Sequence, residues 1–131
     1  MAPVLLDTTV LIDILRGREG AIGRLRRLRD QGDTPYVCAI NVEEVARGLR
    51  RSEEPAAEQL LTALGSAPLG AAEGWVAGEW RRQQAADGRT LAQADCLVAA
   101  AAAALGGRLA TGNPRDFPFP DLEVDHWPAG E

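Results

Sequence analysis

Lysine is absent from this chain of 131 residues, so all fourteen basic residues are arginine. A Walker A phosphate loop and a Schiff-base mechanism both require a lysine, and both are therefore excluded. The chain has only one histidine, His126, and only two serines, Ser52 and Ser66, which leaves little material for a Ser-His-Asp triad. If the protein is an enzyme, we expect its chemistry to depend on carboxylates.

Cysteines and long apolar runs are also scarce. The two cysteines, Cys38 and Cys96, lie in apolar stretches without metal-ligand spacing, which indicates buried reduced thiols. No apolar run approaches the roughly 20 residues that cross a bilayer, and no basic segment precedes Val4 as in a secretory signal. We therefore expect a cytoplasmic protein with no membrane contact, and its length predicts one domain over residues 1–131.

The net charge of −5 argues mildly against a protein that attracts nucleic acid by its overall field. The arginines are clustered, however, and the densest segment contains Arg16, Arg18, Arg24, Arg26, Arg27 and Arg29. Such a cluster is either a set of solvated helix faces or a rim that follows phosphates around an acidic centre. The sequence leaves both interpretations open.

Short apolar strands alternate with amphipathic helices along the chain. Strands are predicted at residues 4–6, 36–40, 67–69, 108–111 and 122–124. Helices are predicted at residues 10–15, 20–30, 41–49, 52–64, 73–86 and 94–105. The predicted N-caps are Thr8 or Thr9, Asn41, and Thr90 with Gln93 at capping-box spacing. This order predicts an α/β sandwich with a short, mainly parallel sheet.

Acidic residues follow several of the predicted strands. Asp7 ends the first apolar run. Glu43 and Glu44 come directly after the second strand, and Asp116 follows the fourth. Because ligands bind at the carboxyl edge of open parallel sheets, we expect these side chains to gather there. Each of these acids also has a simpler explanation. Asp7 and Asp116 could be cap or turn residues, and Glu44 could form a capping hydrogen bond to the backbone of its own helix.

Asp95 is the only charged residue in a predicted helix that is otherwise apolar on every face. A carboxylate buried without a partner costs several kcal/mol, and its own helix contains no cation to neutralise it. Carboxylates gathered around Asp95 would repel one another unless a divalent ion bridged them, and hard oxygen ligands select Mg²⁺ or Mn²⁺. Such an ion suits phosphodiester hydrolysis.

Four segments together resemble a PIN-domain ribonuclease, specifically a VapC-type toxin of a bacterial toxin–antitoxin pair. The segments are Leu5-Leu6-Asp7-Thr8-Thr9-Val10-Leu11, Ala39-Ile40-Asn41-Val42-Glu43-Glu44-Val45-x-x-Gly48, Gly88-x-x-Leu91-x-x-x-Asp95-x-Leu97-Val98-Ala99-Ala100 and Leu109-Ala110-Thr111-Gly112-Asn113-x-x-Asp116-Phe117. Each segment is a weak signal alone. In this order and spacing, over nearly the whole chain, they form a specific one.

The resemblance implies a PIN-like three-layer α/β/α sandwich and an endoribonuclease that depends on Mg²⁺ or Mn²⁺. It also implies RNA as the substrate, a homodimer, and inhibition by a small VapB-like antitoxin. By motif position, Asp7 and Asp95 would be metal ligands, and Glu44 would bind or position the metal and its water. Thr8 and Thr111 would orient these acids by hydrogen bonds.

The chain departs from the family pattern at two places. Thr9 stands where the family often has Asn, and the fourth acid of relatives falls either at the position of Asn113 or at that of Asp116. Only Asp116 is acidic here, so it is the predicted fourth acid and ligand, with Asn113 in support. Helical periodicity places Glu43 slightly nearer the core than Glu44, whereas the motif spacing selects Glu44, and the prediction follows the motif.

Two other classes of function compete with this prediction. A phosphatase of the haloacid-dehalogenase type also begins with a strand that ends in Asp, but it needs a second Asp where this chain has Thr9, and a later lysine. A catalytically silent PIN-fold binding module would hold a partner peptide against the acidic groove. The presence of all four acids argues against a silent module.

Overall fold

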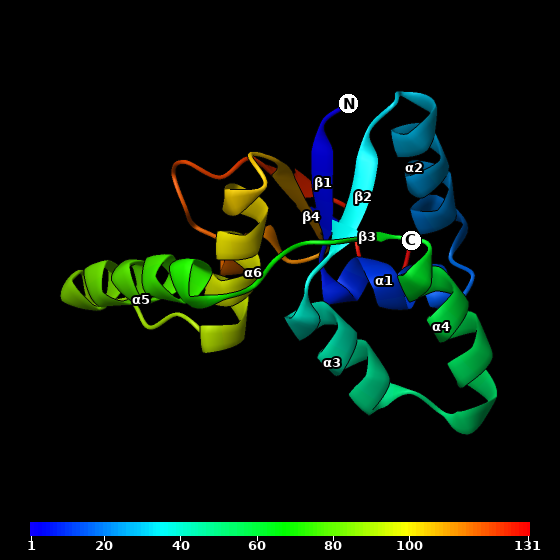
Figure 1. Ribbon diagram of the computed structural model, residues 1–131, viewed down its shortest axis with the longest axis horizontal. Coiled ribbons are helices and arrows are strands. Elements are labelled where there is room, and N and C mark those ends of the chain that lie inside the picture. The colour runs from blue at the N-terminus through cyan, green and yellow to red at the C-terminus, as the bar shows by residue number, and fades with distance from the viewer.

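The strands of the fold are β1 (Pro3–Leu6), β2 (Thr34–Val37), β3 (Gly65–Ser66), β4 (Arg108–Thr111) and β5 (Val124–His126). The computed structural model describes all of residues 1–131. The strands form one central sheet in the order β3-β2-β1-β4-β5, and every neighbouring pair is parallel (Figure 1). The predicted α/β sandwich is therefore confirmed, and the sheet is parallel throughout.

The helices are α1 (Thr8–Leu15), α2 (Glu19–Asp30), α3 (Ala39–Gly48), α4 (Glu54–Thr62), α5 (Ala71–Ala86) and α6 (Gln93–Ala104). Two short 3₁₀ turns, η1 (Arg51–Glu53) and η2 (Pro114–Asp116), lie before α4 and after β4. No helix combines the length and the apolar character needed to pass through a bilayer.

Each face of the sheet has its own apolar core, because side chains alternate between the faces along a strand. Leu5 and Leu109 point to the face covered by α5 and α6. Val4, Leu6 and Ala110 point to the face covered by α1, α2 and α4 (Figure 1). Ala99–Ala102 of α6 are buried between α5 and the sheet, as predicted for a central helix, whereas Ala103 and Ala104 at its end are exposed.

The start of α3 differs from the prediction. The preceding strand ends at Val37, and Cys38 rather than Asn41 is the N-cap. Asn41 lies in the first turn instead, where its Oδ1 accepts a hydrogen bond from the backbone N–H of Cys38 at 3.0 Å. This internal bond lets the helix begin at Ala39, before the residue that was predicted to cap it.

The predicted caps of α1 and α6 are also wrong. Asp7 is the N-cap of α1, so the helix begins at Thr8. Ala92 is the N-cap of α6, and the predicted capping box of Thr90 and Gln93 does not form. More than one residue near the start of each helix could act as its cap. Where the preceding strand or loop ends decides which of them does.

The two edge strands are displaced from their predicted positions. β3 lies two residues earlier than predicted, because Gly65 packs its backbone against the ring of Tyr36 and Pro68 cannot donate to a ladder. β5 lies two residues later than predicted, because Leu122 is buried in the core instead of paired in the sheet.

Candidate functional site

Asp7 lies at the carboxyl edge of the sheet, directly after β1. Its backbone N–H donates to the carbonyl of Ala110 at 2.9 Å, which continues the pairing with β4 past the end of the strand. The residue is only 8% exposed, and its side chain makes no capping bond to α1. Its Oδ2 instead accepts a hydrogen bond from the hydroxyl of Thr111 at 2.8 Å. A capping role therefore does not explain this buried carboxylate.

Glu44 reaches the same edge from α3. Its Oε1 accepts a hydrogen bond from the Thr8 hydroxyl at 2.7 Å. The Thr8 oxygen in turn accepts a hydrogen bond from Nδ2 of Asn41 at 3.3 Å. Glu43 is exposed, so the geometry joins Glu44 rather than Glu43 to the residues around Asp7.

Asn41 belongs to this network, and its role was missed in the sequence. Its side chain is completely buried, and it links Thr8 of α1 to Cys38 at the start of α3. The available signal was a lone amide between the apolar residues Ile40 and Val42, because a buried polar group requires hydrogen-bond partners. The prediction that Asn41 is an N-cap already gave its side chain a hydrogen-bond partner in the local backbone, so no distant partner was sought.

Two threonines fix the chain where it leaves β4. Thr111 is fully buried, and besides donating to Asp7 it accepts a hydrogen bond from the backbone N–H of Asn113 at 3.1 Å. The Thr9 hydroxyl oxygen accepts one from the N–H of Gly112 at 3.0 Å. Asn113 thus supports the site through its backbone, while its side chain is exposed.

Asp95 and Asp116 face the site from other elements. Asp95 lies in the first turn of α6 and is half-buried, whereas Asp116 lies in η2 and is exposed. Both line one open cavity. Neither is neutralised by an ion pair, since both ion pairs of the chain belong to Arg108, which binds Asp33 and Asp125.

The four carboxylates share one electrostatic environment. Burial raises the pKa of Asp95 to about 6, together with repulsion from Asp116, Asp7 and Glu44. Burial also raises the pKa of Asp7, and the hydrogen bond from Thr111 partly offsets this effect. The proton affinities of Asp95 and Asp7 are therefore set in part by repulsion from the other acids.

The donor atoms around Asp7 are carboxylate oxygens, which are the ligands that Mg²⁺ and Mn²⁺ prefer. As the side chains stand, no three His, Cys, Asp or Glu residues lie close enough together to enclose one ion. Threonine hydroxyls hold Asp7 and Glu44, whereas the exposed Asp116 is free to rotate. The residues fit a divalent ion in chemistry and charge, with a partly organised coordination sphere.

Residues 4–122 match the model of the PIN domain, and the chain belongs to that family. Over 120 residues it is 32% identical to Ribonuclease VapC19 of Mycobacterium tuberculosis, a match that covers 91% of this chain and 96% of that protein. The resemblance to a VapC-type PIN domain, based on four segments of the sequence, is thereby confirmed.

Solved structures share the fold. The structure of DNA-bound VapBC from Salmonella typhimurium matches with a TM-score of 0.84 at 19% identity, over 97% of this chain and 99% of that one. A toxin–antitoxin complex from Klebsiella pneumoniae matches with a TM-score of 0.74 at 22% identity, over 91% and 94% of the two chains. These matches confirm the PIN-like α/β/α sandwich.

Proposed function

We propose that the protein is a metal-dependent endoribonuclease toxin of the VapC type, which hydrolyses RNA phosphodiester bonds with Mg²⁺ or Mn²⁺. The observation that carries the proposal is the buried Asp7, hydrogen-bonded by Thr111 and near further acids that form no ion pair. Membership of the PIN-domain family and likeness to a protein named a ribonuclease support the same chemistry.

The proposed catalytic and metal-binding residues are Asp7, Glu44, Asp95 and Asp116. Asp7 suits a rigid ligand, because the sheet fixes its backbone and a buried threonine fixes its carboxylate. Glu44 is held by a hydroxyl and is placed to bind the metal or to accept a proton from the attacking water. Asp95 and Asp116 would complete the site from the cavity that they line.

A bound divalent ion supplies a Lewis acid, which lowers the pKa of a water molecule and offsets charge on the phosphate and on the leaving oxygen. The chain supplies the position of the acids. Asn41 holds Thr8, and Thr8 holds Glu44, so this carboxylate is restrained before substrate arrives. Such restraint lowers the entropic cost of reaching the reactive arrangement.

The proposed inhibitor is a small VapB-like antitoxin. Four acids that form no ion pair within the chain would attract an inserted Arg or Lys of that partner, which would occupy the place of the metal. An antitoxin without its C-terminal basic residues should then lose inhibition in a cleavage assay. Full inhibition by the shortened antitoxin would contradict this mode of binding.

We further propose a homodimer that acts in the cytoplasm. Cys38 and Cys96 are both buried and unpaired, which suits a reducing compartment where RNA is present. For the dimer, the supporting observation is a large apolar side chain, Trp75, that is 72% exposed on α5.

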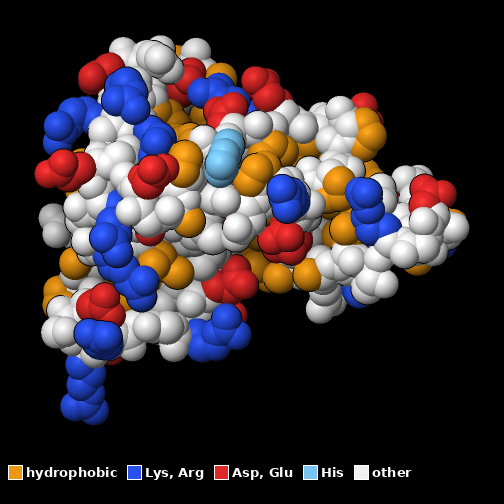
Figure 2. Space-filling model, turned by 180° about the vertical axis from the view of Figure 1, so that it is seen from behind, with side chains coloured by type: hydrophobic (Ala, Val, Ile, Leu, Met, Phe, Trp, Pro, Cys, Tyr) orange, Lys and Arg blue, Asp and Glu red, His pale blue; other side chains and the backbone are white.

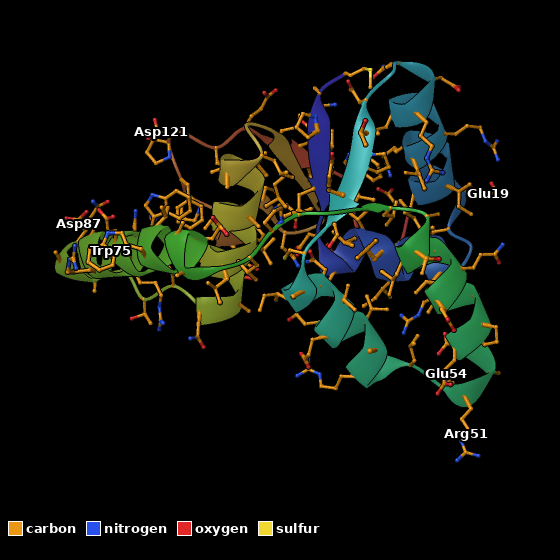
Figure 3. The ribbon with its side chains drawn as sticks, in the orientation of Figure 1. Glu19, Arg51, Glu54, Trp75, Asp87 and Asp121 are labelled. Carbon is orange, nitrogen blue, oxygen red and sulfur yellow. The ribbon has the colours of Figure 1, made fainter.

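Cleavage of a structured RNA tests the proposed activity. Purified protein receives RNA with Mg²⁺ or Mn²⁺, and parallel samples contain EDTA or the variant Asp95→Asn. Asp121→Asn is the matched control, because Asp121 is an exposed carboxylate on an outer loop (Figure 3). We expect the wild type and the control to produce 5′-phosphate and 3′-hydroxyl ends. In EDTA, or with Asp95→Asn, the cleavage rate should fall by about 100-fold or more. Equal cleavage in all samples would contradict the proposed activity.

A further inference from the structure

An open cavity of about 630 Å³ lies beside the acidic site. Its walls come from the loop between α5 and α6, the first turn of α6 and the segment after β4, and they include Arg89, Thr90, Asp95, Arg115, Asp116 and Pro118. This volume lies within the range of ligand-binding sites. The cavity thus combines two of the proposed catalytic acids with two arginines that have no role so far.

The opposite charges in this cavity form no ion pairs with one another. Arg89 and Arg115 are exposed, and both ion pairs of the chain belong to a different arginine, Arg108. Asp95 and Asp116 therefore line the same cavity as the two guanidinium groups without forming an ion pair to either of them. Unpaired guanidinium groups next to an acidic centre are available to bind an anion.

The backbone of Arg89 is fixed by the end of α5. The N–H of Gly88 donates to the carbonyl of Ala85 at 3.0 Å, and the N–H of Arg89 donates to that of Gln84 at 2.8 Å. This is the pattern of a Schellman motif, and Gly88 adopts the positive φ of 79° that the motif requires. Arg89 therefore leaves the helix in a defined direction, at the wall of the cavity.

The backbone of Arg115 is fixed by η2. The N–H of Asp116 donates to the carbonyl of Asn113 at 3.0 Å, and the N–H of Phe117 donates to that of Pro114 at 3.1 Å. Phe117 is buried and anchors the turn in the core. Both arginines thus project from ordered turns, which reduces the flexibility that each would lose on binding a ligand.

The arginine side chains form no continuous basic track on the face seen in Figure 2. There, blue arginine side chains are spread over the surface with red acidic side chains among them. Attraction of a polyanion by the whole surface is also opposed by the net charge of −5. Arg89 and Arg115, by contrast, line the same cavity as Asp95 and Asp116.

We propose that Arg89 and Arg115 clamp backbone phosphates of the RNA and thereby position the strand across Asp95 and Asp116. The proposal rests on the ribonuclease function and extends it to the placement of the substrate. A guanidinium group binds two phosphate oxygens at once, which fixes direction as well as distance. The two arginines are positioning residues, since the reacting atoms lie at the acids.

The cavity also predicts how the RNA is recognised there. None of its lining residues is aromatic, so its walls offer no aromatic ring on which a base could stack. Contacts to phosphates fix the register of a strand and carry no sequence information. The clamp should therefore strengthen binding of every RNA equally, and the choice of cleavage sequence should depend on other residues.

Single-substitution variants test the clamp through steady-state kinetics on a short single-stranded RNA. Arg89→Gln and Arg115→Gln should each raise KM about tenfold or more, as expected for loss of a charge-assisted contact, with kcat nearly unchanged. The exposed Arg82→Gln, on α5 outside the cavity, is the matched control and should leave both constants unchanged. Arg115→Lys should recover part of the loss, because lysine keeps the charge without the planar fork.

RNA binding measured by fluorescence anisotropy in EDTA gives a second readout that needs no catalysis. In a plot of log affinity against log salt, each clamp variant should reduce the slope by about 0.7, the share of one phosphate contact on a single strand. An RNA with one neutral methylphosphonate at the contacted linkage should bind the wild type more weakly, with no further loss in the matching arginine variant.

Different outcomes separate the clamp from the proposed function. If the wild type cleaves RNA and the clamp variants bind and cleave RNA as Arg82→Gln does, the clamp is wrong and the proposed function stands. Wild-type protein that cleaves no RNA with Mn²⁺ would overturn the function, while anisotropy still tests the clamp. Loss of antitoxin inhibition in Arg89→Gln or Arg115→Gln, with unchanged RNA binding, would assign the cavity to the antitoxin and also overturn the clamp.

Discussion

The ionised carboxylate of Asp95 lowers the free energy of unfolding of the protein. Folding raises the pKa of Asp95 from its ordinary value of 3.8 to about 6, so the folded protein holds a proton that the unfolded chain releases. Stability therefore falls as the pH rises through this window, and above it the full cost of the ionised carboxylate applies. A bound cation would offset that cost.

Asp95→Asn should accordingly stabilise the metal-free protein at neutral pH. The raised pKa corresponds to about 3 kcal/mol. Because the side chain is only half-buried, solvent screening reduces the expected gain to about 1 kcal/mol. Denaturant unfolding in EDTA measures this gain, which should nearly disappear at about pH 4, where Asp95 is protonated in the folded protein. An equal gain at both pH values would contradict the assignment.

Thr111→Val tests the hydrogen bond to Asp7 with almost no change of shape. The lost donor removes an interaction with the charged carboxylate, so the pKa of Asp7 should rise further. Cleavage should then fall more at acidic than at alkaline pH, because the acid limb of the pH–rate profile moves to higher pH. Thr62→Val, at an exposed threonine on α4, is the control, and identical profiles for both variants would contradict the role of Thr111.

At the scale of elements, the network between α1 and α3 depends on Asn41. Its completely buried amide bonds Thr8 and the backbone of Cys38, so Asn41→Ala leaves buried groups unpaired. We expect the free energy of unfolding to fall by about 1 to 3 kcal/mol. Because Glu44 loses its restraint, kcat should also fall with KM nearly unchanged. Urea unfolding and steady-state kinetics measure both effects, and a variant as stable and active as the wild type would contradict the network.

The sequence predicted the parallel sheet and placed Asp7, Glu44, Asp95 and Asp116 at one edge of it, because these features follow from local runs and a known motif. Where elements begin and end was predicted less well. The hydrogen bond between Asn41 and Thr8 joins residues that are distant in sequence, and it exists only because β1 and β2 are neighbours. Local patterns contain no information of that kind.

The edge strands illustrate the same limit. β3 is placed by contact of Gly65 with the Tyr36 ring on the neighbouring strand, and β5 by the burial of Leu122. Propensity favoured Ala67–Leu69 and Leu122–Val124 as strands, since it counts apolar residues and not the partners they meet. Arg89 and Arg115 were missed for a similar reason, because their loops are brought together only in the folded chain.

At the scale of the whole molecule, α5 projects from the body and packs mainly against α6 (Figure 1). Its Trp75 points outward (Figure 3) and is 72% exposed. We expect Trp75→Ser to convert the proposed homodimer to a monomer in size-exclusion chromatography with light scattering, because tryptophan is a common anchor of interfaces. Arg51→Ser, at an exposed site beside α4, is the control. A monomeric wild type, or an unchanged mass for Trp75→Ser, would contradict the dimer surface.

Calorimetric titration with Mn²⁺ most directly tests the central claim, that the acids at the carboxyl edge of the sheet hold a catalytic divalent ion. We predict saturable Mn²⁺ binding to the wild type and to Asp121→Asn, with an affinity at least about tenfold lower in Asp7→Asn and in Asp95→Asn. Absence of Mn²⁺ binding to the wild type, or equal binding to all four proteins, would contradict the claim and favour a catalytically silent binding module.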